Sequence, residues 1–267
     1  MVLLKAASDF FLHFGVGTLM ALALIREPEL KKSFYQFTAT LCAVFISFGL
    51  FMGDWTLPGI GYLVASLPFV VGFYALYSAD HAGLARASLL AAITLGLIGL
   101  FGMLAYDEGK IGALLNPWQH ALLIANTVTS LCLAGIVLCT LVLGHWYLLS
   151  PRLSFRPLVH GALLFFWAVW LRLAILVAIL VAFGWANGMT GRLFLERLLS
   201  WDDFGMFFLL RVFWGIIGPL VLSFMVYKTA QIQSNQSATG ILYVALVFVL
   251  IGELISNYLW ALAGISV

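Results

Sequence analysis

Ionisable side chains interrupt several apolar segments of this sequence, where they could do chemistry. Arg172, Arg211 and Glu253 stand inside such segments, and Asp9 and His13 lie four residues apart in an earlier one. Residues at this spacing share one face of a helix. A charge away from water is costly, so these five residues are the first candidates for a functional site.

Glu253 begins a polar helical face. Ser256, Asn257 and Trp260 follow it at the third, fourth and seventh positions, which lie on one side of a helix. We expect this side to point into a helical bundle. Glu253 could pair with Arg172 as a structural ion pair, or act as a proton relay or part of a ligand cavity. Both interpretations stay open on the sequence alone.

The elements that position these residues are membrane-spanning helices. Of the 267 residues, 64% are hydrophobic and 9% are charged, whereas soluble domains carry about 25% charged residues. One span needs about 20 mostly apolar residues, so the sequence predicts an all-α, polytopic membrane bundle of about eight helices. We expect one transmembrane domain over residues 1–267, with helices at about 6–26, 33–53, 57–78, 82–106, 117–149, 156–186, 202–229 and 238–264.

Local signals refine these expected helices. The charged stretch at 107–110 is expected to begin a loop, and Pro68 and Pro219 are expected to kink their helices. Small residues such as Gly17 and Gly135 favour close helix packing, more simply within the chain than with a partner.

The distribution of Lys and Arg predicts the orientation in the membrane. The connections after the first, third, fifth and seventh helices carry more of them than the opposite side, namely Arg26, Lys31, Lys32, Arg86, Arg152, Arg156 and Lys228 against Lys5, Lys110, Arg192 and Arg197. Basic residues concentrate on the cytoplasmic side. Both termini are therefore expected outside, which is the periplasm if the chain lies in a bacterial inner membrane.

Several classes of function are disfavoured. A formal net charge of +2 without a basic cluster gives no reason to expect a nucleic-acid partner. Cys42, Cys132 and Cys139 lie in apolar runs and form no CxxC motif, so we expect no metal site in this chain. Haem b is conceivable but disfavoured, because His120 and His145 are 25 residues apart, about 37 Å along a helix, and both fall near the membrane surfaces.

A quinone site fits the candidate residues better. A quinone needs an apolar cleft, a hydrogen-bond donor at each carbonyl and proton carriers connected to water. His13 with Asp9, His120 and Arg211 all fall near the expected outer surface. Histidine would donate and carry protons, aspartate would orient it, and arginine would hold partial negative charge. Glu253 completes the hypothetical quinone and proton path.

The last helix carries a family resemblance. The segment 252–260, with Gly252 followed by Glu253, resembles the final helix of the membrane anchors of DMSO reductase, and the whole chain resembles NrfD/PsrC-like subunits in its hydropathy. In DMSO reductase anchors an arginine usually follows where Asn257 stands here. The resemblance implies a subunit that anchors an iron–sulfur or cytochrome protein and exchanges electrons with menaquinone or ubiquinone.

Three alternatives remain besides this quinone-linked anchor of an oxidoreductase complex. The chain could be a transporter or channel for a small solute, a haem b cytochrome, or a purely structural membrane subunit. A transporter needs a polar pathway, to which only Arg172 and Glu253 point. A cytochrome would show a haem spectrum. In a structural subunit, changes at Glu253, Arg211 or His13 would harm assembly but leave turnover per complex normal.

Overall fold

The structure, a computed structural model, describes residues 2–25, 30–54, 56–111, 117–149, 154–185, 195–202 and 204–263. Within these ranges the chain is helical and contains no strand. The helices are α1 (Val2–Leu24), α2 (Lys32–Met52), α3 (Ile60–Ser78), α4 (Ala82–Ile111), α5 (Pro117–Leu149), α6 (Arg156–Ile179), the π-helix η1 (Leu180–Trp185), α8 (Gly205–Val212), the π-helix η2 (Phe213–Ile217), α9 (Gly218–Gln231) and α10 (Asn235–Ala263).

These elements form eight spans, counted over the described residues, that are long and apolar enough to cross a membrane. In hydrocarbon every backbone N–H and C=O must find a partner within the protein, and a helix satisfies this condition within one segment. The chain is an integral membrane protein with an all-α, polytopic fold, as the sequence predicted.

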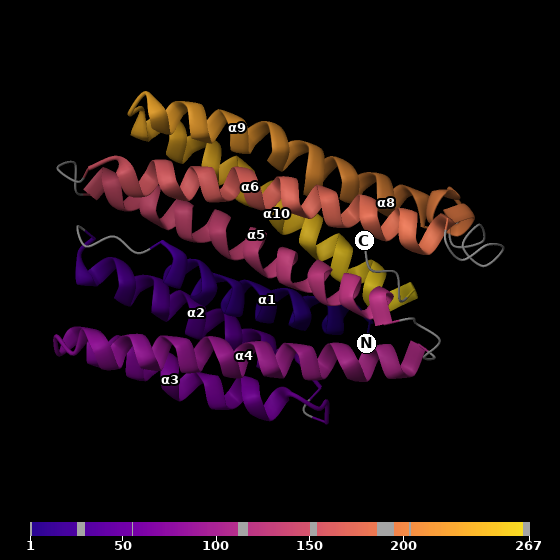
Figure 1. Cartoon of the computed structure of the whole chain (residues 1–267), viewed down its shortest axis with the longest axis horizontal. Coiled ribbons are helices and arrows are strands. Elements are labelled where there is room, and N and C mark those ends of the chain that lie inside the picture. Colours follow the sequence, from indigo (N-terminus) through magenta and orange to yellow (C-terminus); the bar gives the residue numbers. More distant parts are fainter. Residues whose placement is uncertain are drawn as a thin grey trace.

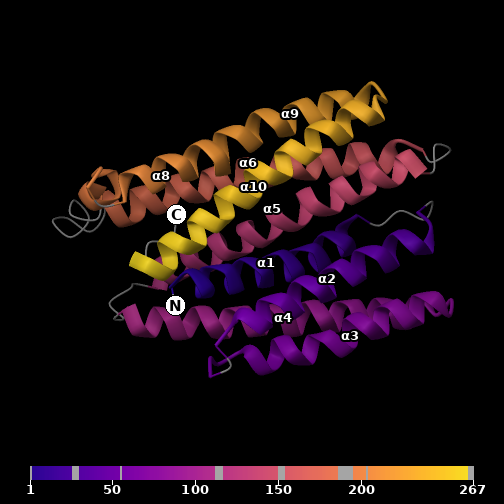
Figure 2. The same ribbon diagram turned by 180° about the vertical axis from the view of Figure 1, so that it is seen from behind.

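The spans pack side by side in a sequence of layers (Figures 1 and 2). The pair α3 and α4 lies on one side, and α1 and α2 come next. Helix α5 lies between α1 and α6, α10 packs against both α1 and α5, and α8 and α9 lie on the far side. The start of α1 and the end of α10 lie at the same end of the bundle (Figure 1). The residues near the start of α1 and near the end of α10 can therefore share one site.

Helix α5 is the centre of the bundle. In its most apolar stretch 83% of the residues are buried, compared with 67% in α1 and 28% in α3. Gly17 of α1 and Gly135 of α5 make this packing possible, because a methyl group at Gly135 would overlap the carbonyl of Gly17 and one at Gly17 would overlap the carbonyl of Leu131. This small-residue contact lies within the chain.

Some boundaries differ from the expected ones. Helix α1 begins at Val2 rather than near residue 6, and the last span begins at Asn235. Helix α4 continues to Ile111, so the prediction of a loop beginning at 107–110 is wrong. Charged residues end an apolar span but not a helix, because a helix can continue into water. The connections at 26–29 and 150–153 lie outside the described residues.

Prolines have different effects in two spans. Pro68 lies inside α3, which stays helical from Ile60 to Ser78. Pro219 instead follows η2, a π-helical segment between α8 and α9. Proline has no N–H and its ring crowds the preceding turn of a helix. The wider π-helical turn before Pro219 makes room for this ring. This irregular segment begins two residues after Arg211.

Candidate functional site

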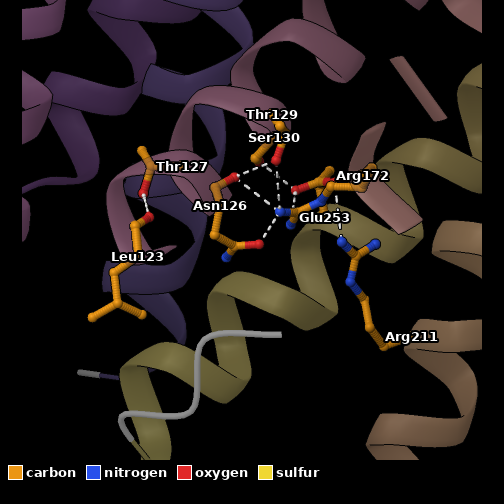
Figure 3. A network of polar contacts seen from close by, with 8 residues as sticks. All are labelled: Leu123, Asn126, Thr127, Thr129, Ser130, Arg172, Arg211 and Glu253. Atoms are coloured by element: carbon orange, nitrogen blue, oxygen red, sulfur yellow. Dashed lines mark hydrogen bonds and ion pairs between the residues drawn. The ribbon is translucent and has the colours of Figure 1, made fainter. Parts of the chain in front are cut away.

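A buried ion triad joins three spans. On α10, Glu253 accepts from two arginines, with Arg172 Nη2 of α6 at 3.4 Å from Oε2 and Arg211 Nη2 of α8 at 3.3 Å from Oε1 (Figure 3). None of the three side chains is more than 3% exposed. The pair Arg172–Glu253 is the one expected from the sequence, whereas Arg211 was expected near the outer surface as part of a quinone site.

Helix α5 supplies neutral oxygen atoms to the same centre. Ser130 donates a hydrogen bond to Glu253 Oε2, and Arg172 Nη1 donates to the backbone carbonyl of Asn126 at 2.8 Å and to the Asn126 side-chain oxygen (Figure 3). Thr129 Oγ1 lies 3.4 Å from the same nitrogen. A buried ion pair is tolerated when hydrogen bonds satisfy the remaining donors and acceptors. The polar part of α5 has this role.

Two glycines make room for Arg211. Gly215 in η2 and Gly252 in α10 face each other, and a methyl group at Gly252 would overlap the Cα of Gly215 and lie 3.0 Å from Arg211 Nη1. A methyl group at Gly215 would overlap the same guanidinium nitrogen. The guanidinium therefore reaches Glu253 only because neither position carries a side chain.

A polar cavity of about 50 Å³ lies beside the triad. Five spans line it, α1, α4, α5, α6 and α10, through Asp9, His13, Leu100, Met103, Leu104, Asn126, Thr127, Ser130, Arg172, Ser256, Asn257 and Trp260. Asp9, Leu104 and Trp260 are half-buried, whereas Arg172, Asn126 and Asn257 are buried. The cavity thus runs from a partly exposed rim, on the side of the termini, down to the triad.

Three buried nitrogen atoms around this cavity have no hydrogen-bond partner among the described residues. They are His13 Nδ1, Arg172 Nε and Asn257 Nδ2. Buried polar groups are almost always hydrogen-bonded, to protein or to water. A water molecule needs about 10–15 Å³ of such space, so the cavity is large enough for a few waters that can bridge these groups.

The structure brings most of the expected site residues together. Asp9 and His13 line the cavity, and Arg211 and Glu253 belong to the triad beside it. His13 lies eleven residues after the start of α1, about 16 Å along the helix, which is deeper than the sequence suggested. His120 lies near the start of α5 and does not line the cavity.

Several residues of the centre were missed by sequence reasoning. Asn126, Thr129 and Ser130 bind the charged groups, but they are not ionisable and were not among the predicted site residues. A signal for them existed, because residues 126–130 of α5 place an amide and three hydroxyl groups within an otherwise apolar span. Gly215, like Gly17 and Gly135, was expected to favour close helix packing, but its contact with Gly252 depends on how α10 crosses η2, which the sequence does not show.

The cavity also sets a limit on what fits inside it. Sites for drug-sized ligands occupy about 300–1,000 Å³, which is several times the volume found here. A quinone ring does not fit within the cavity in this structure, whereas water does. Any ring that exchanges protons with it has to lie at the rim, near Trp260 and Asp9.

Comparisons with known proteins add no family to this description, because no family model matches the chain and no curated protein or solved structure is significantly similar to it.

Proposed function

We propose that this protein is the membrane-anchor subunit of a respiratory or redox complex, and that its polar cavity exchanges protons with a quinone. One observation carries the proposal. In a bundle surrounded by lipid, a histidine with an unpartnered ring nitrogen and a carboxylate, His13 and Asp9, line one polar cavity beside a buried ion triad. Such groups are costly to keep in a membrane and usually serve ion or proton movement.

Glu253, His13 and Asp9 have different roles in this proton transfer. Glu253 already accepts hydrogen bonds from Arg172, Arg211 and Ser130. Its role is to balance the charge of the arginines and to hold the side chains at the inner end of the cavity. His13 has a ring nitrogen available to the cavity and is the proton carrier. Asp9, at the half-buried rim, connects His13 with water outside.

The chemistry needs two protons for each quinone. Reduction of a quinone takes two electrons and two protons and gives a quinol, and oxidation returns both. The electrons come from or go to an iron–sulfur or cytochrome subunit bound at the face that carries the termini. The protons pass between the ring at the rim and His13 through water in the cavity.

The same proposal includes the membrane in which the protein lies and its orientation there. The excess of Lys and Arg on the opposite face makes that face cytoplasmic, so both termini and the cavity rim face the periplasm of a bacterial inner membrane. The quinone is menaquinone or ubiquinone, and the partner subunit docks on the periplasmic side. The resemblance of segment 252–260 to anchor subunits of DMSO reductase supports this assignment.

Purification of the intact assembly tests the proposal. The protein is extracted from its native membrane in a mild detergent, co-purifying chains are identified by mass spectrometry, and quinol oxidation and the reduced-minus-oxidised spectrum are measured. We expect iron–sulfur or cytochrome partners and quinol-dependent turnover. A solitary, colourless protein without turnover would contradict the proposal and favour solute transport, and a haem spectrum from this chain alone would favour a cytochrome.

A further inference from the structure

A second pocket lies at the opposite end of the bundle, between the first four spans. It has a volume of about 350 Å³ and is formed by the end of α1, the start of α2, the end of α3 and the start of α4. This volume lies in the range of ligand sites, and it is several times that of the cavity beside the triad. The pocket shares no residue with that cavity.

Aromatic side chains form one wall of this pocket. The rings of Tyr35 and Tyr77 lie 4.9 Å apart between centroids, and those of Phe73 and Tyr77 lie 5.5 Å apart. Tyr35 and Phe73 are buried, so their positions are fixed by packing. Leu89 and Leu90 of α4 extend the apolar lining, and Leu90 is 58% exposed. The pocket therefore opens sideways onto the surface that faces lipid.

One charged group lines the pocket. Arg86 lies in the second turn of α4, is exposed, and forms no ion pair with another described residue. The neighbouring cation at this end, Lys32, is already paired with Asp80 at 2.5 Å. The start of α4 adds free backbone N–H groups and the positive end of its helix dipole. Charge at the pocket mouth is thus positive and uncompensated among the described residues.

We propose that this pocket binds one acyl lipid with an anionic head group, independently of the function proposed above. The phosphate or carboxylate lies against Arg86 and the first turn of α4, and the acyl chain lies against the aromatic wall. A zwitterionic lipid such as phosphatidylcholine brings a cation together with its phosphate and leaves the net positive charge at Arg86 in place, so charge complementarity selects an anionic lipid. A phospholipid and a free fatty acid share this chemistry.

Native mass spectrometry of the purified, delipidated full-length protein tests the proposal. Phosphatidylglycerol, phosphatidylcholine and oleate are titrated separately, and the fraction of protein with one bound lipid is measured. The variants are Arg86→Gln, which removes the charge, and Ala23→Phe, which fills the pocket and keeps Arg86. Lys228→Gln is the control, because it removes an exposed positive charge from the same end of the bundle outside both pockets.

We expect the wild type and Lys228→Gln to bind one phosphatidylglycerol at least tenfold more tightly than phosphatidylcholine. Arg86→Gln and Ala23→Phe should each weaken this binding at least tenfold. One-to-one binding of oleate but not of phosphatidylglycerol, with the same losses in both variants, would identify a free fatty acid as the source. Binding that is unchanged in Arg86→Gln, or equally weakened in Lys228→Gln, would overturn the proposal.

Discussion

Gly252 of α10 and Gly215 of η2 face each other so closely that a methyl group at Gly252 would lie 2.8 Å from the backbone nitrogen of Gly215. This contact determines the position of Arg211, whose guanidinium passes beside both glycines to reach Glu253. The ion triad therefore depends on two residues that carry no side chain. A π-helical turn at residues 213–217 and the proline that follows accompany this close approach.

Gly252→Ala should destabilise the protein. The added methyl group overlaps backbone and guanidinium atoms that cannot all move, and overpacking of this kind costs about 1–3 kcal/mol. Thermal unfolding in detergent measures the effect. Gly240→Ala on the same helix is the control, because a methyl group there meets no atom within 4 Å. Equal unfolding temperatures of the two variants would contradict the role assigned to Gly252.

Glu253→Gln should be more damaging than the glycine change. It leaves two buried arginines without a carboxylate, and loss of one partner of a buried ion pair costs about 3–5 kcal/mol. Removal of Arg211 as well, in Glu253→Gln/Arg211→Met, should restore part of the stability, because one uncompensated charge disappears. Unfolding of these variants is compared with that of Glu196→Gln, an exposed acid whose change should matter little. Additive effects of Glu253→Gln and Arg211→Met would show that the two residues do not interact.

The sequence predicted the fold more fully than the site. Apolar composition and segment length predicted the all-α membrane bundle, because lipid permits few alternatives. The ion pair of Arg172 with Glu253 was expected because both residues fall deep in their spans. The third member, Arg211, was expected near the outer surface, because a depth read from sequence does not show how a side chain is oriented. The size of the cavity and the packing of Gly215 on Gly252 arise from the arrangement of helices, which one sequence without relatives does not specify.

If the cavity is hydrated, a cysteine introduced into its lining should react faster with a water-soluble reagent than one in the apolar core. Thiols react with water-soluble methanethiosulfonate reagents as thiolates, which form in water and not in an apolar core. Thr127 lines the cavity and Thr140 lies on the same helix, fully buried against Gly161. In a chain whose native cysteines are replaced by alanine, Thr127→Cys should be labelled at least tenfold faster than Thr140→Cys, as measured by mass spectrometry.

The same cysteine variants test which face of the bundle the cavity opens toward. In sealed vesicles of known orientation, a membrane-impermeant reagent should reach Thr127→Cys from the side that carries the termini. Equal labelling rates at the two positions would contradict a hydrated cavity. Faster labelling from the opposite side would contradict a rim that faces the termini.

Quinol turnover per assembled complex tests most directly whether His13 carries protons for a quinone. His13→Phe keeps an aromatic ring of similar size but has no group for proton transfer, and such transfer is worth about a hundredfold or more in rate. His145→Phe, an exposed histidine near the other end of the bundle, is the control. His13→Phe should lower turnover about a hundredfold while the partner subunits still co-purify, and His145→Phe should leave turnover unchanged. Normal turnover per complex in His13→Phe would contradict the role of His13 as the proton carrier.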